Sequence, residues 1–170
     1  MEDREVIIAK IDEYIDWLAE PNEAFGGFPI CPFVKKERAS GKLKYELFEA
    51  NKTSSIFNII GSWDMEDDYD SMIIAHLSDI TLREHKIFQH YINRGLRKRK
   101  MGYIKVICFH PDDTFEVGEV KTRNKAPYFL INVAYADVLN KAHQSLNNTK
   151  YFDNFTEENN KYLKVKSLDK

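Results

Sequence analysis

The sequence predicts an α/β fold: a single small sheet of about three or four strands, partly parallel, covered by helices. Segments with helix and strand patterns alternate along the chain, in the order helix, strand, helix, strand, helix, strand, helix, which is typical of this class. A long helix between two strands favours a right-handed parallel crossover. With 170 residues, 43% of them hydrophobic and 13% aromatic, the chain can form one packed domain.

The first half of the chain is expected to supply one strand and two helices. Apolar residues at helical spacing predict a first helix that ends before Pro21. Its apolar positions are Val6, Ile7, Ile11, Tyr14, Ile15 and Leu18. The segments that follow are a Pro-, Gly- and Phe-rich loop over 21–36, an alternating strand over 42–49, a short helix over 53–63 with a strand as the alternative, and an acidic loop over 64–70.

Two buried strands and a long helix are predicted in the middle of the chain. Residues 71–77 form a short apolar run, and residues 103–109 give the clearest strand pattern. Between them, residues 81–100 predict a helix that opens with a capping box of Thr81 and Glu84. Its expected apolar stripe consists of Leu82, Ile87, Phe88, Tyr91, Ile92 and Leu96.

The C-terminal part is predicted to contain one more helix and a tail. After a loop through Pro127, residues 128–146 have a helical pattern. A single α/β domain is expected over residues 1–150. Residues 151–170 are expected to form a polar tail whose aromatic residues dock on the body while its end frays.

Charge and hydropathy narrow the functional classes. The formal net charge of −2 argues against a nucleic-acid binder, which needs a basic excess. Residues 94–100 are basic. They lie at a predicted helix C-terminus, where the helix dipole favours cations, and phosphate binding is the less favoured alternative. The acidic, periodic N-terminus does not resemble a secretory signal, and no apolar run is long enough for a membrane span. We therefore expect a cytoplasmic protein with no membrane partner.

A cysteine and two histidines are the strongest candidates for a site. Cys31 lies in a proline-flanked loop, while His76 and His110 each end a predicted buried strand. If the two strands are parallel neighbours, both imidazoles emerge at the carboxyl edge of the sheet, where such sheets bind ligands. Cys108 lies in an apolar run and is expected to be a buried hydrophobic residue.

Two chemistries and one structural interpretation are compatible with this set. Cys31 could be a nucleophile with His110 as general base, His76 assisting and Asp112 orienting a histidine. Alternatively, Cys31, His76 and His110 could bind a transition metal such as zinc. In the structural interpretation the histidines are hydrogen-bonded core residues and Cys31 is packed by Phe28 and Phe33.

The expected partner is a small molecule, with an anion favoured by nearby lysines and arginines. The residues expected to bind it are Phe33, Lys35, Phe115, Asn124 and Tyr128. Asn124 could instead hold its loop. A different hypothesis is a non-catalytic binding module, in which Phe25, Phe28 and Phe33 contact a ligand or a partner.

Four motifs, taken in order over residues 3–146, resemble a bacterial family, the domain of unknown function number fourteen-fifteen. "ICPFVK" matches its first motif from Cys31 to Lys35, and "MIIAHL" matches its second at His76 without the following proline. "FHPDDTF" matches the third around His110, and "NKAPYF" matches the fourth from Asn124. The resemblance implies a shared fold and a shared Cys/His region, and it implies no particular activity.

The chain departs from the family pattern near its last helix. The family's final helix tends to begin with a His and an Arg-Glu pair. The corresponding places here hold Asn132, Tyr135 and Ala136. If those polar residues serve an activity in the family, this chain has lost or changed it, which favours the binding-module hypothesis.

Overall fold

The computed structural model describes residues 2–23, 27–31, 33–49, 55–117, 120–147 and 149–151, and confirms the α/β class. Phe25 and Pro32 lie outside these ranges. The described helices are α1 (Arg4–Ala19), α2 (Phe33–Ala39), α3 (Ile56–Asp64), α4 (Leu82–Lys98) and α5 (Ala136–Asn147). The strands are β1 (Leu43–Phe48), β2 (Ser71–His76), β3 (Ile104–Phe109), β4 (Thr114–Val117), β5 (Val120–Arg123) and β6 (Phe129–Tyr135). No helix within these ranges is long and apolar enough to cross a membrane.

The main sheet has four strands in the order β1-β2-β6-β3. Strands β1 and β2 are parallel, and β6 runs antiparallel to both β2 and β3. Strands β2 and β3 therefore point the same way, as expected, but they are not neighbours because β6 lies between them. Strands β4 and β5 form a separate antiparallel hairpin.

The strand β6 corrects the prediction of one helix over residues 128–146. Residues Phe129–Tyr135 form a central strand, and α5 begins only at Ala136. A short apolar run gives no clear period, and here pairing with a strand on each side decides the outcome. Asn132 therefore lies in a strand and not at the start of a helix. A second correction concerns the loop expected over 21–36, since α2 already begins at Phe33.

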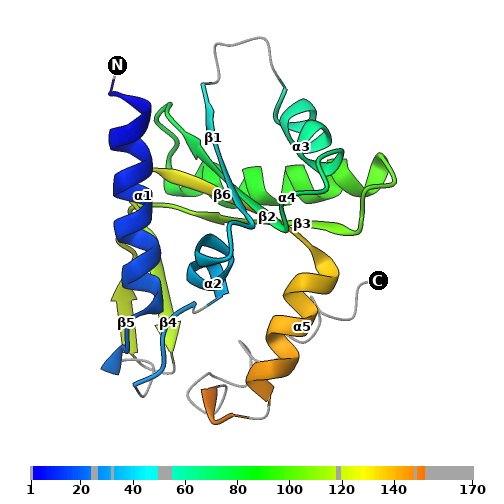
Figure 1. Ribbon diagram of the computed structural model, residues 1–170. Coiled ribbons are helices and arrows are strands. Elements are labelled where there is room, and N and C mark those ends of the chain that lie inside the picture. Colours follow the sequence, from blue (N-terminus) through cyan, green and yellow to red (C-terminus); the bar gives the residue numbers. More distant parts are fainter. Residues whose placement is uncertain are drawn as a thin grey trace.

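Helices cover the two faces of the sheet in separate layers (Figure 1). One buried cluster joins α1 and α2 to Ile73 and Ala75 of β2. The other joins α3 and α4 to Met72 and Ile74 of the same strand. Side chains alternate between the faces of a strand, so we call these the α1–α2 face and the α3–α4 face. Helix α5 projects from the end of β6 and buries none of its described residues (Figure 1).

Helix α4 begins as predicted but buries a different stripe. The capping box of Thr81 and Glu84 is present. Ile87 and Tyr91, expected to be buried, are 61% and 60% exposed. The buried residues of the helix are His85, Ile92, Gly95 and Leu96. The buried stripe thus includes a histidine in place of an isoleucine.

Two side chains of α4 cover the outer edge of β3. Asn93 Nδ2 donates to the Val106 carbonyl at 2.8 Å, and the Val106 N–H donates to Asn93 Oδ1 at 3.0 Å. The Cys108 N–H donates to Gln89 Oε1 at 2.7 Å. These bonds satisfy backbone groups that β6 does not reach.

The chain beyond α5 returns to the body at Tyr151. Its hydroxyl donates to the Ile30 carbonyl at 2.7 Å, and its ring packs edge-on against Phe28. The expected docking of tail aromatic residues is thus observed at Tyr151. The rest of the predicted tail lies outside the described residues.

Candidate functional site

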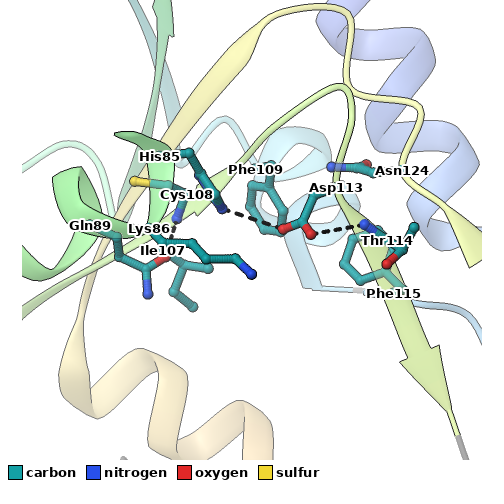
Figure 2. A pocket seen from close by; sticks show the side chains of 10 residues that line it. All are labelled: His85, Lys86, Gln89, Ile107, Cys108, Phe109, Asp113, Thr114, Phe115 and Asn124. Carbon is teal, nitrogen blue, oxygen red and sulfur yellow. Dashed lines mark hydrogen bonds and ion pairs between the residues drawn. The ribbon is translucent and has the colours of Figure 1, made fainter. Parts of the chain in front are cut away.

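A pocket of about 430 Å³ lies at the β3 edge of the sheet (Figure 2). Helix α4, strand β3 and the start of the β4–β5 hairpin form its walls. The residues that line it, hereafter the edge pocket, are His85, Lys86, Gln89, Ile107, Cys108, Phe109, Asp113, Thr114, Phe115 and Asn124. It combines an apolar floor with a few polar groups, as ligand sites in proteins do.

His85 and Asp113 form an ion-pair contact in the edge pocket. The distance from His85 Nε2 to Asp113 Oδ2 is 3.3 Å, and His85 is only 5% exposed (Figure 2). Asp113 Oδ1 accepts the Thr114 N–H at 2.9 Å. Within the described part of the chain, His85 Nδ1 is buried without a hydrogen-bond partner. This places the proton on Nε2, where Asp113 accepts it.

The protonation of His85 is set by opposing influences. Burial lowers its pKa below the ordinary value, while the Asp113 carboxylate raises it. The neighbouring His110 and Lys86 side chains lower this pKa further. The neutral imidazole is therefore favoured unless a ligand brings additional negative charge.

The position of Asp113 is fixed by Asn124, which is 3% exposed. The Asn124 N–H donates to the Asp113 carbonyl at 2.9 Å, and Asn124 Nδ2 donates to the His110 carbonyl at 2.9 Å. Asn124 Oδ1 accepts the Tyr14 hydroxyl at 2.7 Å. Asn124 thus holds its loop, and it also lines the edge pocket.

His110 is held by backbone groups at both ring nitrogens. Nε2 donates to the Ile80 carbonyl, and Nδ1 accepts the Asp112 N–H at 3.0 Å. The Asp112 carboxylate lies 4.0 Å from Nδ1, is 67% exposed and also faces Arg123. Asp112 therefore contacts His110 most closely through its backbone N–H.

His76 is enclosed by aromatic rings on the α3–α4 face. Its ring lies 5.0 Å from that of Phe48 and 5.7 Å from that of Phe129, between centroids. Its Nδ1 contacts the backbone of Ser78, and burial lowers its pKa. His85 and His110 also pack against Phe129, at 5.5 and 6.3 Å. The structure thus brings the two predicted histidines to one side of the sheet, with His85 as a third.

Cys31 lies on the other side of the sheet. It packs against the cluster of the α1–α2 face, and its N–H donates to the Leu18 carbonyl at 2.8 Å. Burial raises the pKa of its thiol, against the effect of the Phe33 and Val34 N–H groups. The expected meeting of Cys31 with His76 and His110 is therefore wrong. Across the described ranges, no group of three or more His, Cys, Asp or Glu residues is placed to hold a metal ion.

Two of the five predicted ligand-binding residues, Phe115 and Asn124, line the edge pocket. The other three are not among its lining residues. Lys35 pairs with Asp16 at 3.1 Å, the Tyr128 hydroxyl bonds to Glu2, and Phe33 begins α2.

Sequence reasoning missed the polar residues that define the edge pocket, which are His85, Lys86, Gln89 and Asp113. The available signal was the helical spacing of His85 with Ile92 and Leu96. Helical spacing places these three residues on one face of the helix, so the sequence pattern already indicated a histidine on the buried side of α4.

Comparison with known proteins identifies the family of this chain. No curated protein and no solved structure matches it significantly. A family model described as "Protein of unknown function (DUF1415)" matches residues 10–170, and it is the family that the sequence motifs indicate. The chain therefore belongs to the DUF1415 family.

Proposed function

We propose that this protein binds a small molecule in the edge pocket, and that the His85–Asp113 pair is part of the polar wall that the ligand contacts. The observation that supports this most is the contact of the buried His85 with Asp113 at the wall of a pocket that Phe109 and Phe115 also line. Buried polar groups usually have full hydrogen-bonding partners. A histidine with one nitrogen unpartnered, among the described residues, is an exception of the kind found at binding sites.

Acid–base catalysis by the same two residues is the second candidate function. A carboxylate beside an imidazole in a pocket is an arrangement that transfers protons in many enzymes. In this function Asp113 would hold the proton of His85 Nε2, and His85 Nδ1, which has no hydrogen-bond partner among the described residues, would exchange a proton with a bound substrate.

The thiol-nucleophile hypothesis has less support. Nucleophilic cysteines need a lowered thiol pKa and a base within hydrogen-bonding reach. Cys31 has a raised pKa, and the histidines lie across the sheet from it.

A screen of small-molecule fragments by ligand-observed NMR tests the binding function. Hits are then titrated into ¹⁵N-labelled protein, and we expect amide shifts to cluster at residues 85–89, 107–109 and 113–115. The variants His85→Gln and Asp113→Asn should weaken binding of the hits. His90→Gln is the matched control, because His90 is exposed on the same helix. Hits that shift other regions, or that bind His85→Gln unchanged, would overturn the proposal.

A further inference from the structure

We infer that the ligand of the edge pocket is a monoanionic carboxylate joined to a flat apolar group. The inference rests on the proposed function and specifies the chemical class of its ligand. The edge pocket has two features that support this inference. Lys86 and Gln89 form a donor-rich wall on α4, and Phe109 and Phe115 form an aromatic floor.

Lys86 supplies the positive charge of the donor-rich wall. Its side chain lines the edge pocket and, in the view of Figure 2, extends from α4 in the direction of Asp113. Nearby cations are otherwise engaged, since Arg123 lies 3.5 Å from Asp112 and Lys125 lies over the ring of Trp17. For Lys86, no ion pair is found with any described residue. Its charge is therefore available to an incoming anion.

Gln89 supplies a second donor in a fixed orientation. Its Oε1 accepts the Cys108 N–H at 2.7 Å, which identifies the oxygen and leaves Nε2 as a donor. Lys86 and Gln89 are three residues apart on α4, so they lie on the same side of the helix. A carboxylate can accept from both at once.

The other polar groups of the pocket favour the same ligand. Among the described residues, Asp113 is the one carboxylate that lines the pocket, and its oxygens already face His85 Nε2 and the Thr114 N–H. In the described part of the chain, no arginine lines the pocket to form the two-pronged contact that phosphate favours. One lysine and one amide therefore suit a single negative charge better than the double charge of a phosphate.

The aromatic floor fits a flat group. The rings of Phe109 and Phe115 lie 6.4 Å apart between centroids, and Trp17 continues the row at 6.4 Å from Phe115. Aromatic rings at this separation pack edge-on or offset against a third ring. A ligand of this kind would place its ring on Phe109 and Phe115 and its carboxylate at Lys86.

Three probes of matched shape test the inference: 3-phenylpropionate, its neutral amide and phenyl phosphate. Affinities are measured by calorimetry, and the site is mapped by ¹⁵N chemical shifts. We expect the carboxylate to bind at the edge pocket at least about tenfold more tightly than either analogue, the size of one charge-assisted hydrogen bond. Lys86→Gln should remove that preference without changing the affinity for the amide. Lys98→Gln, on the last turn of the same helix, should have no effect.

The outcomes separate the two proposals. If the amide or the phosphate binds the pocket as well as the carboxylate, or if Lys86→Gln keeps the preference, the carboxylate inference fails and the binding function stands. If the carboxylate and both analogues leave the pocket residues unshifted, the carboxylate inference fails. The fragment screen then decides the binding function independently.

Discussion

The Cys31 loop and the edge pocket differ in what surrounds their reactive side chains. Backbone groups around Cys31 are hydrogen-bonded. The Tyr151 hydroxyl donates to the Ile30 carbonyl, and the Cys31 N–H donates to the Leu18 carbonyl. In the edge pocket, His85 has one nitrogen without a described partner, and its other nitrogen faces a carboxylate at the border of a cavity. The comparison teaches that a conspicuous loop around a thiol can have its backbone groups paired, while a helix face can present a buried histidine with one nitrogen lacking a described partner.

The largest expected effect is on stability, and it tests the hydrogen bonds by which Asn124 holds the turn beside the edge pocket. Asn124→Ala should lower the free energy of unfolding by about 3 kcal/mol, because it leaves the buried Tyr14 hydroxyl without its partner and removes one of the two hydrogen bonds to the His110 carbonyl. Tyr14→Phe removes one of these bonds and should cost about 1 kcal/mol. Urea denaturation measures both. If the two variants lose the same free energy of unfolding, the hydrogen bonds of Asn124 other than the one to Tyr14 do not contribute to stability.

A smaller effect should appear in the pH dependence of stability. Burial lowers the pKa of His76, His85 and His143 from the ordinary value of about 6.5. The unfolded chain then binds protons more readily than the folded one. Stability is fully present above about pH 6.5 and is lost as the pH falls toward the folded pKa values.

Urea unfolding at pH 7.5 and pH 5.5 measures this loss. We expect a lower free energy of unfolding at pH 5.5, and a smaller decrease in His85→Gln than in the His90→Gln control. A decrease of equal size in the two variants would mean that His85 does not titrate as a buried residue.

The smallest expected effect is that of Cys31 on ligand binding. Cys31→Ala should leave the affinity of any edge-pocket ligand unchanged, because Cys31 is not among the residues that line the pocket, and should cost about 1 kcal/mol of stability through lost packing. The thiol should react slowly with iodoacetamide at pH 7, since its pKa is raised. Rapid alkylation, or a loss of binding, would restore the thiol hypothesis.

The sequence predicted most of the fold because its strongest local signals agree with the tertiary structure. The capping box at Thr81 and the strand at 104–109 are examples. The strand β6 was not predicted, because its partner strands are distant in sequence and its apolar run has no clear period. The α4 stripe was misassigned for a related reason. Ile87 is more apolar than His85, but the tertiary structure buries His85 and exposes Ile87.

The candidate site was predictable only in part. His110 and Asn124 belong to motifs, and both hold the turn that carries Asp113. The pairing of His85 with Asp113 joins a helix to a loop 28 residues later in the sequence, and no local pattern encodes it. The separation of Cys31 from the histidines follows from the strand alternation and from the layer in which α2 packs, which appear only with the full sheet.

The covering of β3 by Gln89 and Asn93 has a consequence for how these molecules behave in crowded solution. An edge strand with open hydrogen-bonding groups can recruit a strand from another copy and start aggregation. Here the amide side chains of α4 already occupy such groups at Val106 and Cys108. A second copy would have to break those bonds before its own strand could pair there. The helix that forms one wall of the edge pocket therefore also limits the growth of the sheet beyond β3.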